Sequence, residues 1–278
     1  MKRIYLSLLA AAAAIAAFSC TPQNEDGKQD EKPPIDINEG GNEEEEEEWT
    51  GDYPKGVSVE PFSDTFSDGK TVNGWVATID FKANPRLKFN TLQGSKRKAP
   101  TEFFRDFNPD KGTPYICVNA GYFAGSTSVS LCIIDGKVRS ISFVDMNWPN
   151  DENCERVIHP VRSALGQQED GSFDIEWVFC TDKPARTQTV FPNTMGNNEK
   201  TRDFIEDPPS ADYPGAYTWT PQQAIGGGPR LLKDGVDVAV DSYWEECLDS
   251  GGTAGLSSQP RTAMGLTEDG KLIILLCD

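Results

Sequence analysis

The chain is poor in positive charge and histidine, and it has no long apolar run beyond its N-terminus. Its 278 residues hold 44 Asp and Glu against 26 Lys and Arg, which gives a net charge of −18. This imbalance argues against a nucleic-acid partner, because a nucleic-acid backbone requires a basic protein face. The single histidine and the lack of a Cys-x-x-Cys pair argue against a zinc site, and no cofactor is expected.

The apolar run at the N-terminus is typical of an export signal. A basic start precedes the run 6–17, which is too short to favour a transmembrane helix. The run leads into Ala-Phe-Ser-Cys, ending at Cys20, and this resembles a bacterial lipoprotein box. We expect residues 1–20 to be a signal peptide and Cys20 to carry lipid, which would anchor the protein in the cell envelope, facing the periplasm or the outer surface. Simple secretion is the alternative.

Residues 21–52 are strongly acidic and include the uninterrupted block Glu43 to Glu48. Such a segment offers almost nothing to bury and is expected to be a disordered tether. The remaining residues 53–278 form one domain's worth of chain with an ample core.

The seven cysteines leave six once Cys20 is assigned to the lipid. An even number in an oxidising compartment permits up to three disulfides, whose pairing the sequence does not reveal. Cys117 and Cys277 lie in apolar, strand-like runs, so buried free thiols are equally compatible with the pattern.

Short strand signals separated by turns dominate this domain and predict a strand-rich α+β fold. Helix signals are few: Thr101 begins one and Thr220-Pro221 another. The stretch 181–220 is rich in Pro, Asn and Asp and is expected to be an insertion loop. The strand signals lie at 74–81, 87–92, 115–123, 129–134, 138–144, 173–179 and 272–276, with Asp-Gly turns at 135, 170, 234 and 269.

One fourteen-residue frame occurs twice, from Arg162 and from Arg261. In both copies Arg, Ala, Gly, Glu, Asp, Gly and the closing Ile coincide, and an earlier Asp-Gly turn, at Asp135 or Asp234, keeps the same offset. We interpret the domain as two pseudo-repeated halves, and a cleft between such halves is a natural ligand site.

Three motifs have the composition of a ligand site. Asn119 to Phe123 (NAGYF) ends an apolar run and suits a sugar pocket wall, or else holds core aromatics. Gly226, Gly227 and Gly228 offer backbone amides to a phosphate, or else form a tight turn. Arg261 and Thr262 suit phosphate binding, although Arg in both copies of the frame can instead bond turn carbonyls. His159 has no partner motif and is expected to be a hydrogen-bonded structural histidine.

The blocks VNAGYF, AIGGGPRLLKDG and QPRTAMGLTEDGKLIILLCD together resemble the phosphodiester glycosidase family over roughly 70–278. The resemblance implies a hydrolase that cleaves the bond between a sugar's anomeric carbon and a phosphate oxygen, with an N-acetylglucosamine-type sugar. A phosphorylated glycan or sugar phosphodiester would be the partner. In the family the Asp of the last strand is followed by Gly-Arg and a later glycine-rich segment, so a chain that stops at Asp278 is expected to be a fragment.

The resemblance also implies the roles of the matching residues. Asp278 and Asn119 would be catalytic, with Asp278 the only matching carboxylate. Gly121, Tyr122, Phe123, Gly226, Gly227, Gly228, Arg261 and Thr262 would bind substrate. Because no acid–base pair is evident in these blocks, a glycan-binding lipoprotein that retains the fold without the chemistry is the second hypothesis.

Overall fold

The computed structural model describes residues 52–66, 69–148, 156–250 and 258–278. In these ranges the chain is rich in strands and has two short α-helices, α1 (Pro100–Arg105) and α2 (Ala239–Glu245), which confirms the predicted α+β class. A 3₁₀ turn covers Pro109–Lys111. The signal peptide, Cys20 and nearly all of the tether lie outside the described residues.

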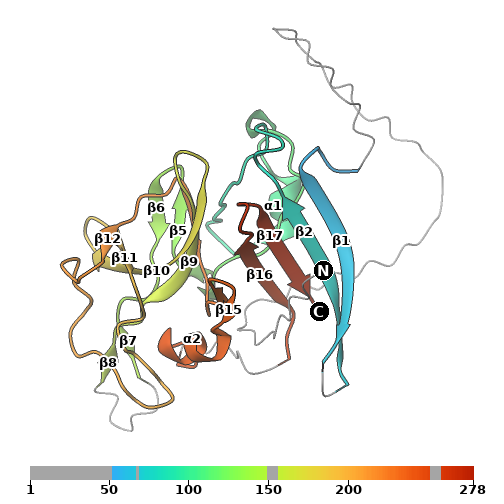
Figure 1. Ribbon diagram of the computed structural model, residues 1–278. Coiled ribbons are helices and arrows are strands. Elements are labelled where there is room, and N and C mark those ends of the chain that lie inside the picture. The colour runs from blue at the N-terminus through green and yellow to red at the C-terminus, as the bar shows by residue number, and fades with distance from the viewer. Residues whose placement is uncertain (1–51, 67–68, 149–155, 251–257) are drawn as a thin grey trace.

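Two antiparallel sheets form the body of the domain and lie side by side in Figure 1. The four-stranded sheet has the order β1 (Val57–Thr65), β2 (Thr71–Ile79), β17 (Leu272–Cys277), β16 (Arg261–Leu266). The seven-stranded sheet has the order β12 (Tyr217–Thr218), β11 (Thr187–Phe191), β10 (Phe173–Asp182), β9 (Arg162–Gln167), β13 (Gln223–Gly226), β5 (Cys132–Ile134), β6 (Lys137–Ser140). Smaller pairs are β3 (Phe123–Ala124) with β4 (Thr127–Ser128), β7 (Met146–Asn147) with β8 (Val157–Ile158), and β14 (Leu232–Lys233) with β15 (Val236–Asp237).

The two sheets share one apolar core. Side chains alternate along a strand, so Leu165 and Ile225 join the core with Ile274 of the four-stranded sheet, while Ala164 and Ala224 pack in a separate cluster. The Phe173 ring at the start of β10 lies 5.1 Å from that of Phe81. The sheets therefore stabilise one another.

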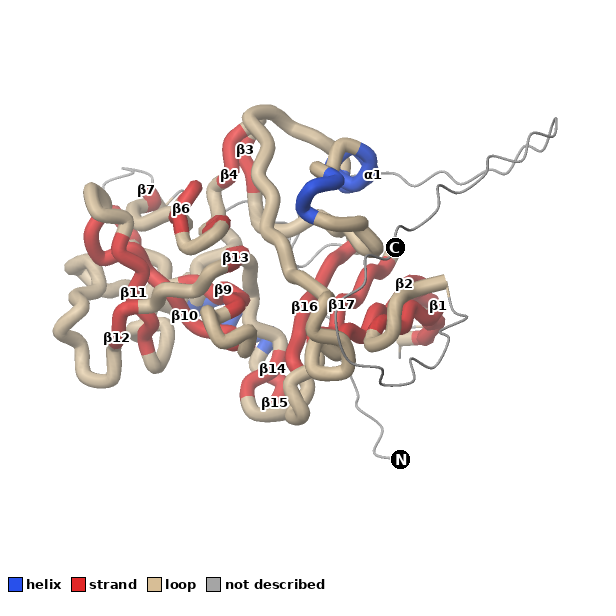
Figure 2. The backbone as a smooth tube through the Cα atoms, turned by 90° about the horizontal axis from the view of Figure 1, so that it is seen from above, coloured by secondary structure: helices blue, strands red, loops and turns tan. Residues whose placement is uncertain are grey.

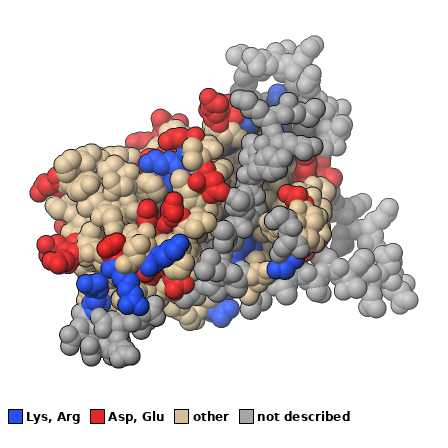
Figure 3. All heavy atoms as spheres, turned by 60° about the horizontal axis from the view of Figure 1, so that its bottom comes forward, with Lys and Arg blue, Asp and Glu red and all other residues tan. Residues whose placement is uncertain are grey.

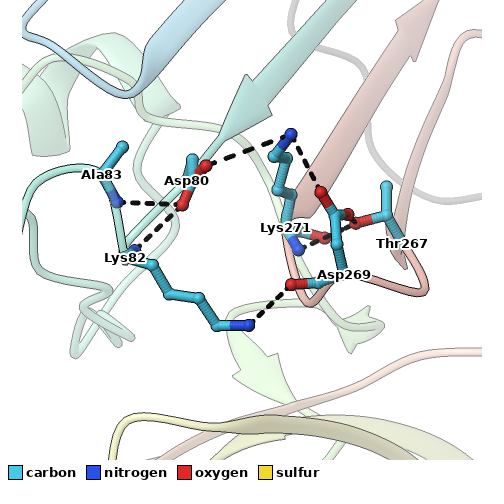
Figure 4. A network of polar contacts seen from close by, with 6 residues as sticks. All are labelled: Asp80, Lys82, Ala83, Thr267, Asp269 and Lys271. Atoms are coloured by element: carbon cyan, nitrogen blue, oxygen red, sulfur yellow. Dashed lines mark hydrogen bonds and ion pairs between the residues drawn. The ribbon is translucent and has the colours of Figure 1, made fainter.

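A polar network fastens the end of β2 to the β16–β17 hairpin (Figure 4). The Asp80 carboxylate accepts from the backbone N–H groups of Lys82 and Ala83, each at 3.0 Å, and lies 4.0 Å from the Lys271 ammonium. Lys82 in turn donates to the Asp269 carbonyl at 2.7 Å. These contacts fix the turn of the second repeat frame against the loop that leads to α1.

Both copies of the repeated frame fold into a hairpin with the same turn. In β9–β10 the Gln168 amide donates to Ser172 O and Gly171 has φ 83°, while in β16–β17 the Thr267 amide donates to Lys271 O and Gly270 has φ 86°. The two hairpins belong to different sheets, however. The Asp135-Gly136 turn joins strands of the large sheet, whereas Asp234-Gly235 joins an isolated pair, so two repeated halves are not confirmed.

The structure corrects several local predictions. The segments 87–92 and 115–122 belong to no strand in the described chain, and of the predicted run only Phe123 does. Thr220-Pro221 begins no helix but precedes β13, whose backbone pairs on both sides with β9 and β5. The stretch 181–220 is no simple loop, because it supplies β11 and β12. Sheet pairing overrides the local signal in each case.

The cysteines that the structure describes are free thiols: Cys117, Cys132, Cys180, Cys247 and Cys277. The alternative of buried free thiols therefore holds for Cys277, and also for Cys132, Cys180 and Cys247, whereas Cys117 is free but only partly buried. Cys154 lies outside the described residues.

Candidate functional site

The segment Asn119–Phe123 connects the other two motif blocks. The Thr262 hydroxyl donates to Asn119 Oδ1 at 2.7 Å, and the Tyr122 hydroxyl donates to the Gly228 carbonyl at 2.5 Å. Residues far apart in sequence thus meet across the two sheets, with Thr262 on β16 and the glycine run at the end of β13. The three motif blocks form one polar centre.

Arg261 belongs to the same centre. Its side chain is buried, and burial lowers the pKa of the guanidinium. Burial also raises the pKa of the Tyr122 phenol, and the Glu246 carboxylate raises it further, whereas Arg162 and Arg261 oppose this shift. Arg261 is therefore within electrostatic range of Tyr122, whose hydroxyl marks the position of the glycine run. A buried cation beside these groups is suited to an anion.

The glycine run is less available to a ligand than the sequence indicated. The Gly226 amide donates to Leu131 O at 2.7 Å and the Gly227 amide to Ser163 O at 2.9 Å. Of the three glycine amides, that of Gly228 alone donates to no backbone carbonyl of the described residues. Gly228 has φ 125°, and a Cβ there would lie 2.5 Å from Glu246 Oε2, so the position requires glycine.

Glu246, at the end of α2, holds this loop in place and was not singled out from the sequence. It is fully buried, and its carboxylate accepts from the Ser163 amide at 3.0 Å, the Ser163 hydroxyl at 2.6 Å, Trp177 Nε1 at 3.1 Å and the Arg230 amide at 2.9 Å. Burial raises the pKa of the carboxyl, and these hydrogen bonds oppose that shift. The residue is a positioning group whose acceptors are already occupied by the protein.

Arg162 has the structural role that the sequence analysis offered as an alternative. Its Nε donates to Glu246 O at 3.1 Å and its Nη2 to Cys247 O at 2.8 Å, and burial lowers its pKa. The two arginines of the repeated frame thus differ in their surroundings. His159 is also structural, because its Nδ1 lies 2.9 Å from Val144 O in a buried position.

Asp278 lies at the edge of this arrangement. Its side chain is exposed, its Oδ1 accepts from the Asn73 amide at 3.0 Å, and its own amide donates to Asn73 O at 3.0 Å. These bonds extend the pairing of β17 with β2 and direct the carboxylate to that strand. No contact of the described residues brings Asp278 to Asn119.

A cavity of about 1050 Å³ adjoins the Asn119–Phe123 segment. Asn119, Gly121, Tyr122 and Phe123 line it, whereas the glycine run, Arg261 and Thr262 do not. Its apolar lining includes Ile225, Met264 and Ile274 from the shared core. Other lining residues come from α1 and the long loops around it, whose backbone Figure 2 shows. The size suits a sugar with a substituent.

The described residues contain no group of three or more His, Cys, Asp or Glu side chains arranged to hold a metal ion. None of their helices is both long and apolar enough to span a bilayer.

Comparison with known proteins finds a family match for the C-terminal part of the chain. Residues 186–278, which contain the glycine run, Arg261 and Thr262, match the model of the phosphodiester glycosidase family, the same family that the sequence motifs indicated. The catalytic domain of zebrafish N-acetylglucosamine-1-phosphodiester alpha-N-acetylglucosaminidase, auto-inhibited by its pro-peptide, is 16% identical with a TM-score of 0.48. That comparison covers 82% of this chain and 63% of the zebrafish chain, so this chain spans less than two thirds of it. No curated protein sequence matches.

Proposed function

We propose that this protein is a hydrolase that cleaves the glycosidic bond of a sugar-1-phosphate diester carrying an N-acetylglucosamine-type sugar. The observation that supports this most directly is the joining of Asn119 to Thr262 and of Tyr122 to Gly228 beside the buried Arg261, in a chain whose residues 186–278 match the model of this family. We further propose that lipid on Cys20 anchors the enzyme in the bacterial cell envelope, facing the periplasm or the outer surface.

In the proposed reaction the oxygen of water bonds to the anomeric carbon as the bond from that carbon to the phosphate oxygen breaks. The phosphate monoester leaves as an anion, and the proton from water passes to solvent. Because phosphate leaves readily as an anion, the reaction has less need of a carboxylic acid with a strongly raised pKa, which an ordinary glycosidase uses to protonate the leaving group. Arg261 and the Gly228 amide stabilise the departing phosphate, and Thr262, whose hydroxyl donates to Asn119 Oδ1, holds Asn119 in place. Asn119 is assigned to sugar orientation. Asp278 is assigned to the cationic sugar centre, a role in which its carboxylate exchanges the bond to the Asn73 amide for contact with the sugar.

The test is incubation of the full-length protein with an N-acetylglucosamine phosphodiester and measurement of released sugar. Arg261→Ala is expected to reduce kcat/KM by about 10²–10³, as loss of one preorganised donor does elsewhere. Arg139→Ala, which removes an exposed arginine on β6, is the matched control and should retain full activity. Absence of turnover on a panel of sugar phosphodiesters would contradict the proposal, and an unchanged rate in Arg261→Ala would assign that residue to structure.

A glycan-binding protein without catalysis is the second candidate. It is favoured by the carboxylates near the site, which already accept hydrogen bonds from the protein. Glu246 already accepts four hydrogen bonds, and Asp278 is bonded to Asn73. Calorimetric binding of a phosphorylated glycan, with no sugar released after prolonged incubation, would select this candidate over the hydrolase.

A further inference from the structure

The cavity beside Asn119–Phe123 is rimmed by positive charge in an otherwise acidic protein. The chain has a net charge of −18, and the face drawn in Figure 3 shows acidic and basic side chains interspersed. Among the residues that line the cavity, by contrast, Glu102 is the one acidic side chain. The basic residues that line it are Arg86, Lys88, Lys96, Arg97, Lys98 and Lys111.

The few nearby carboxylates do not neutralise this rim. Glu102 is committed to the start of α1, where it accepts from the Ala99 amide at 2.7 Å. Lys98 pairs with Asp106 at 3.1 Å, and Lys111 lies 3.8 Å from Asp135. Within the described parts of the chain, Lys88, Lys96 and Arg97 form no ion pair, and all three are exposed.

Arg97 connects the rim to the candidate site. Its guanidinium lies over the Phe123 ring, 4.9 Å from the ring centre. This contact orients the planar group while its N–H donors at the edge stay available to an anion. Phe123 follows Tyr122, which is bonded to Gly228. The segment Asn119–Phe123 thus lies near the buried Arg261 and also contacts the exposed guanidinium of Arg97.

From this arrangement we infer that the substrate's aglycone carries a second phosphate, which Arg97 and Lys96 bind at the cavity rim. Given the proposed function, the substrate lies along Asn119–Phe123, the segment that lines the cavity and is bonded to Thr262 and Gly228, with the scissile phosphate toward Arg261 and the aglycone in the cavity. A site with two separate cationic positions selects a phosphorylated glycan or polyol phosphate over a diester with a neutral aglycone. This deepens the proposed function by naming the substrate class and rests on it.

The experiment compares two substrates of the full-length protein: N-acetylglucosamine 1-phosphate methyl diester and the same sugar phosphate linked to glycerol phosphate. The Lys96→Ala/Arg97→Ala variant should raise KM for the second substrate about tenfold or more and leave KM for the methyl diester unchanged, because only the second offers a charge-assisted partner. Added salt should raise KM of the wild type for the glycerol phosphate substrate and have little effect in the variant.

The control variant, Lys137→Ala/Lys200→Ala, removes two exposed cations that do not line the cavity and should behave as wild type. Equal KM changes for both substrates in Lys96→Ala/Arg97→Ala, or none, would overturn the inference. The inference would also be overturned if Lys96→Ala/Arg97→Ala bound vesicles of anionic lipid more weakly than wild type while both KM values stayed unchanged, since the rim would then bind a membrane.

If neither substrate is hydrolysed, the proposed function fails separately, and calorimetry with the glycerol phosphate compound decides the inference. Binding that is about tenfold weaker in Lys96→Ala/Arg97→Ala than in wild type supports a second phosphate site. Equal binding, or none to the wild type, rejects it.

Discussion

At the scale of single residues, the candidate site depends on a buried carboxylate that has no direct part in the chemistry. Glu246 joins α2, β9, β10 and the segment after the glycine run through four hydrogen bonds. It is fully buried, and Arg162 donates to its backbone carbonyl. A charged acceptor in this position is costly to bury and still more costly to remove, because its donors would be left without partners.

Glu246→Ala is therefore expected to lower the free energy of unfolding by about 3 kcal/mol or more, because each buried donor left without a partner costs about 1–3 kcal/mol. The reason is that the Ser163, Trp177 and Arg230 donors lose their acceptor in a buried region. Urea denaturation measures the change. Asp241→Ala, which removes an exposed carboxylate from the same helix, is the control and should cost no more than about 1 kcal/mol. A similar loss in both variants would refute the special role of Glu246.

Residue identity alone made part of this site predictable. Arg261, Thr262, Asn119 and the glycine run stand in motif blocks that the sequence displays, and the structure brings them together. Glu246 could not be found in this way, because its role depends on burial beneath a loop that lies 18 residues earlier. Arg97 had a signal, since Lys96–Lys98 is a basic run in an acidic chain, but its position over Phe123 follows only from the fold.

At the scale of elements, turns were predicted better than strands. The Asp-Gly turns at 135, 170, 234 and 269 all join hairpin strands, because positive φ is a local requirement that local residues satisfy. The apolar run 115–122 was predicted to be a strand and is not one, since a strand requires a partner that local sequence does not supply. Helix α2 was missed because its seven residues are too few to display a helical period.

The repeated turn gives a test at this scale. Gly270→Ala should destabilise the protein by about 1 kcal/mol or more, because φ 86° is unfavourable for a residue with a Cβ. Gly265→Ala, in β16 of the same hairpin, is the control: a Cβ there meets no atom within 4 Å, and the change should be within about 0.5 kcal/mol of neutral. Thermal denaturation of both variants provides the measurement. An equal loss of stability in Gly270→Ala and Gly265→Ala would mean that the turn does not require the positive φ of a glycine.

At the scale of the whole molecule, the function depends on the two sheets remaining packed together. Arg261 and Thr262 belong to the four-stranded sheet, whereas the glycine run ends a strand of the seven-stranded sheet. The segment Asn119–Phe123 contacts both groups. Neither sheet alone contains the complete centre, so its geometry depends on the core between them.

Phe173 is the residue through which this dependence is best tested. Its ring lies 5.1 Å from that of Phe81 and 5.4 Å from that of Phe89, the latter in an edge-on arrangement, so it links β10 to the segment after β2. Phe173→Ala should lower the free energy of unfolding by about 1–3 kcal/mol, through lost burial and aromatic contacts. Phe104→Ala removes a ring that is 41% exposed on α1 and is the matched control, with an effect near zero.

The form of the transition is as informative as its midpoint. Because the sheets share one core, Phe173→Ala should still unfold in a single step, with tryptophan fluorescence and far-ultraviolet circular dichroism giving the same midpoint. The proposed phosphodiester hydrolysis should be lost at that same midpoint, since the candidate site spans both sheets. Two separated transitions, with activity lost in the first, would show instead that the sheets fold independently and that contact between them, rather than folding of either, limits the function.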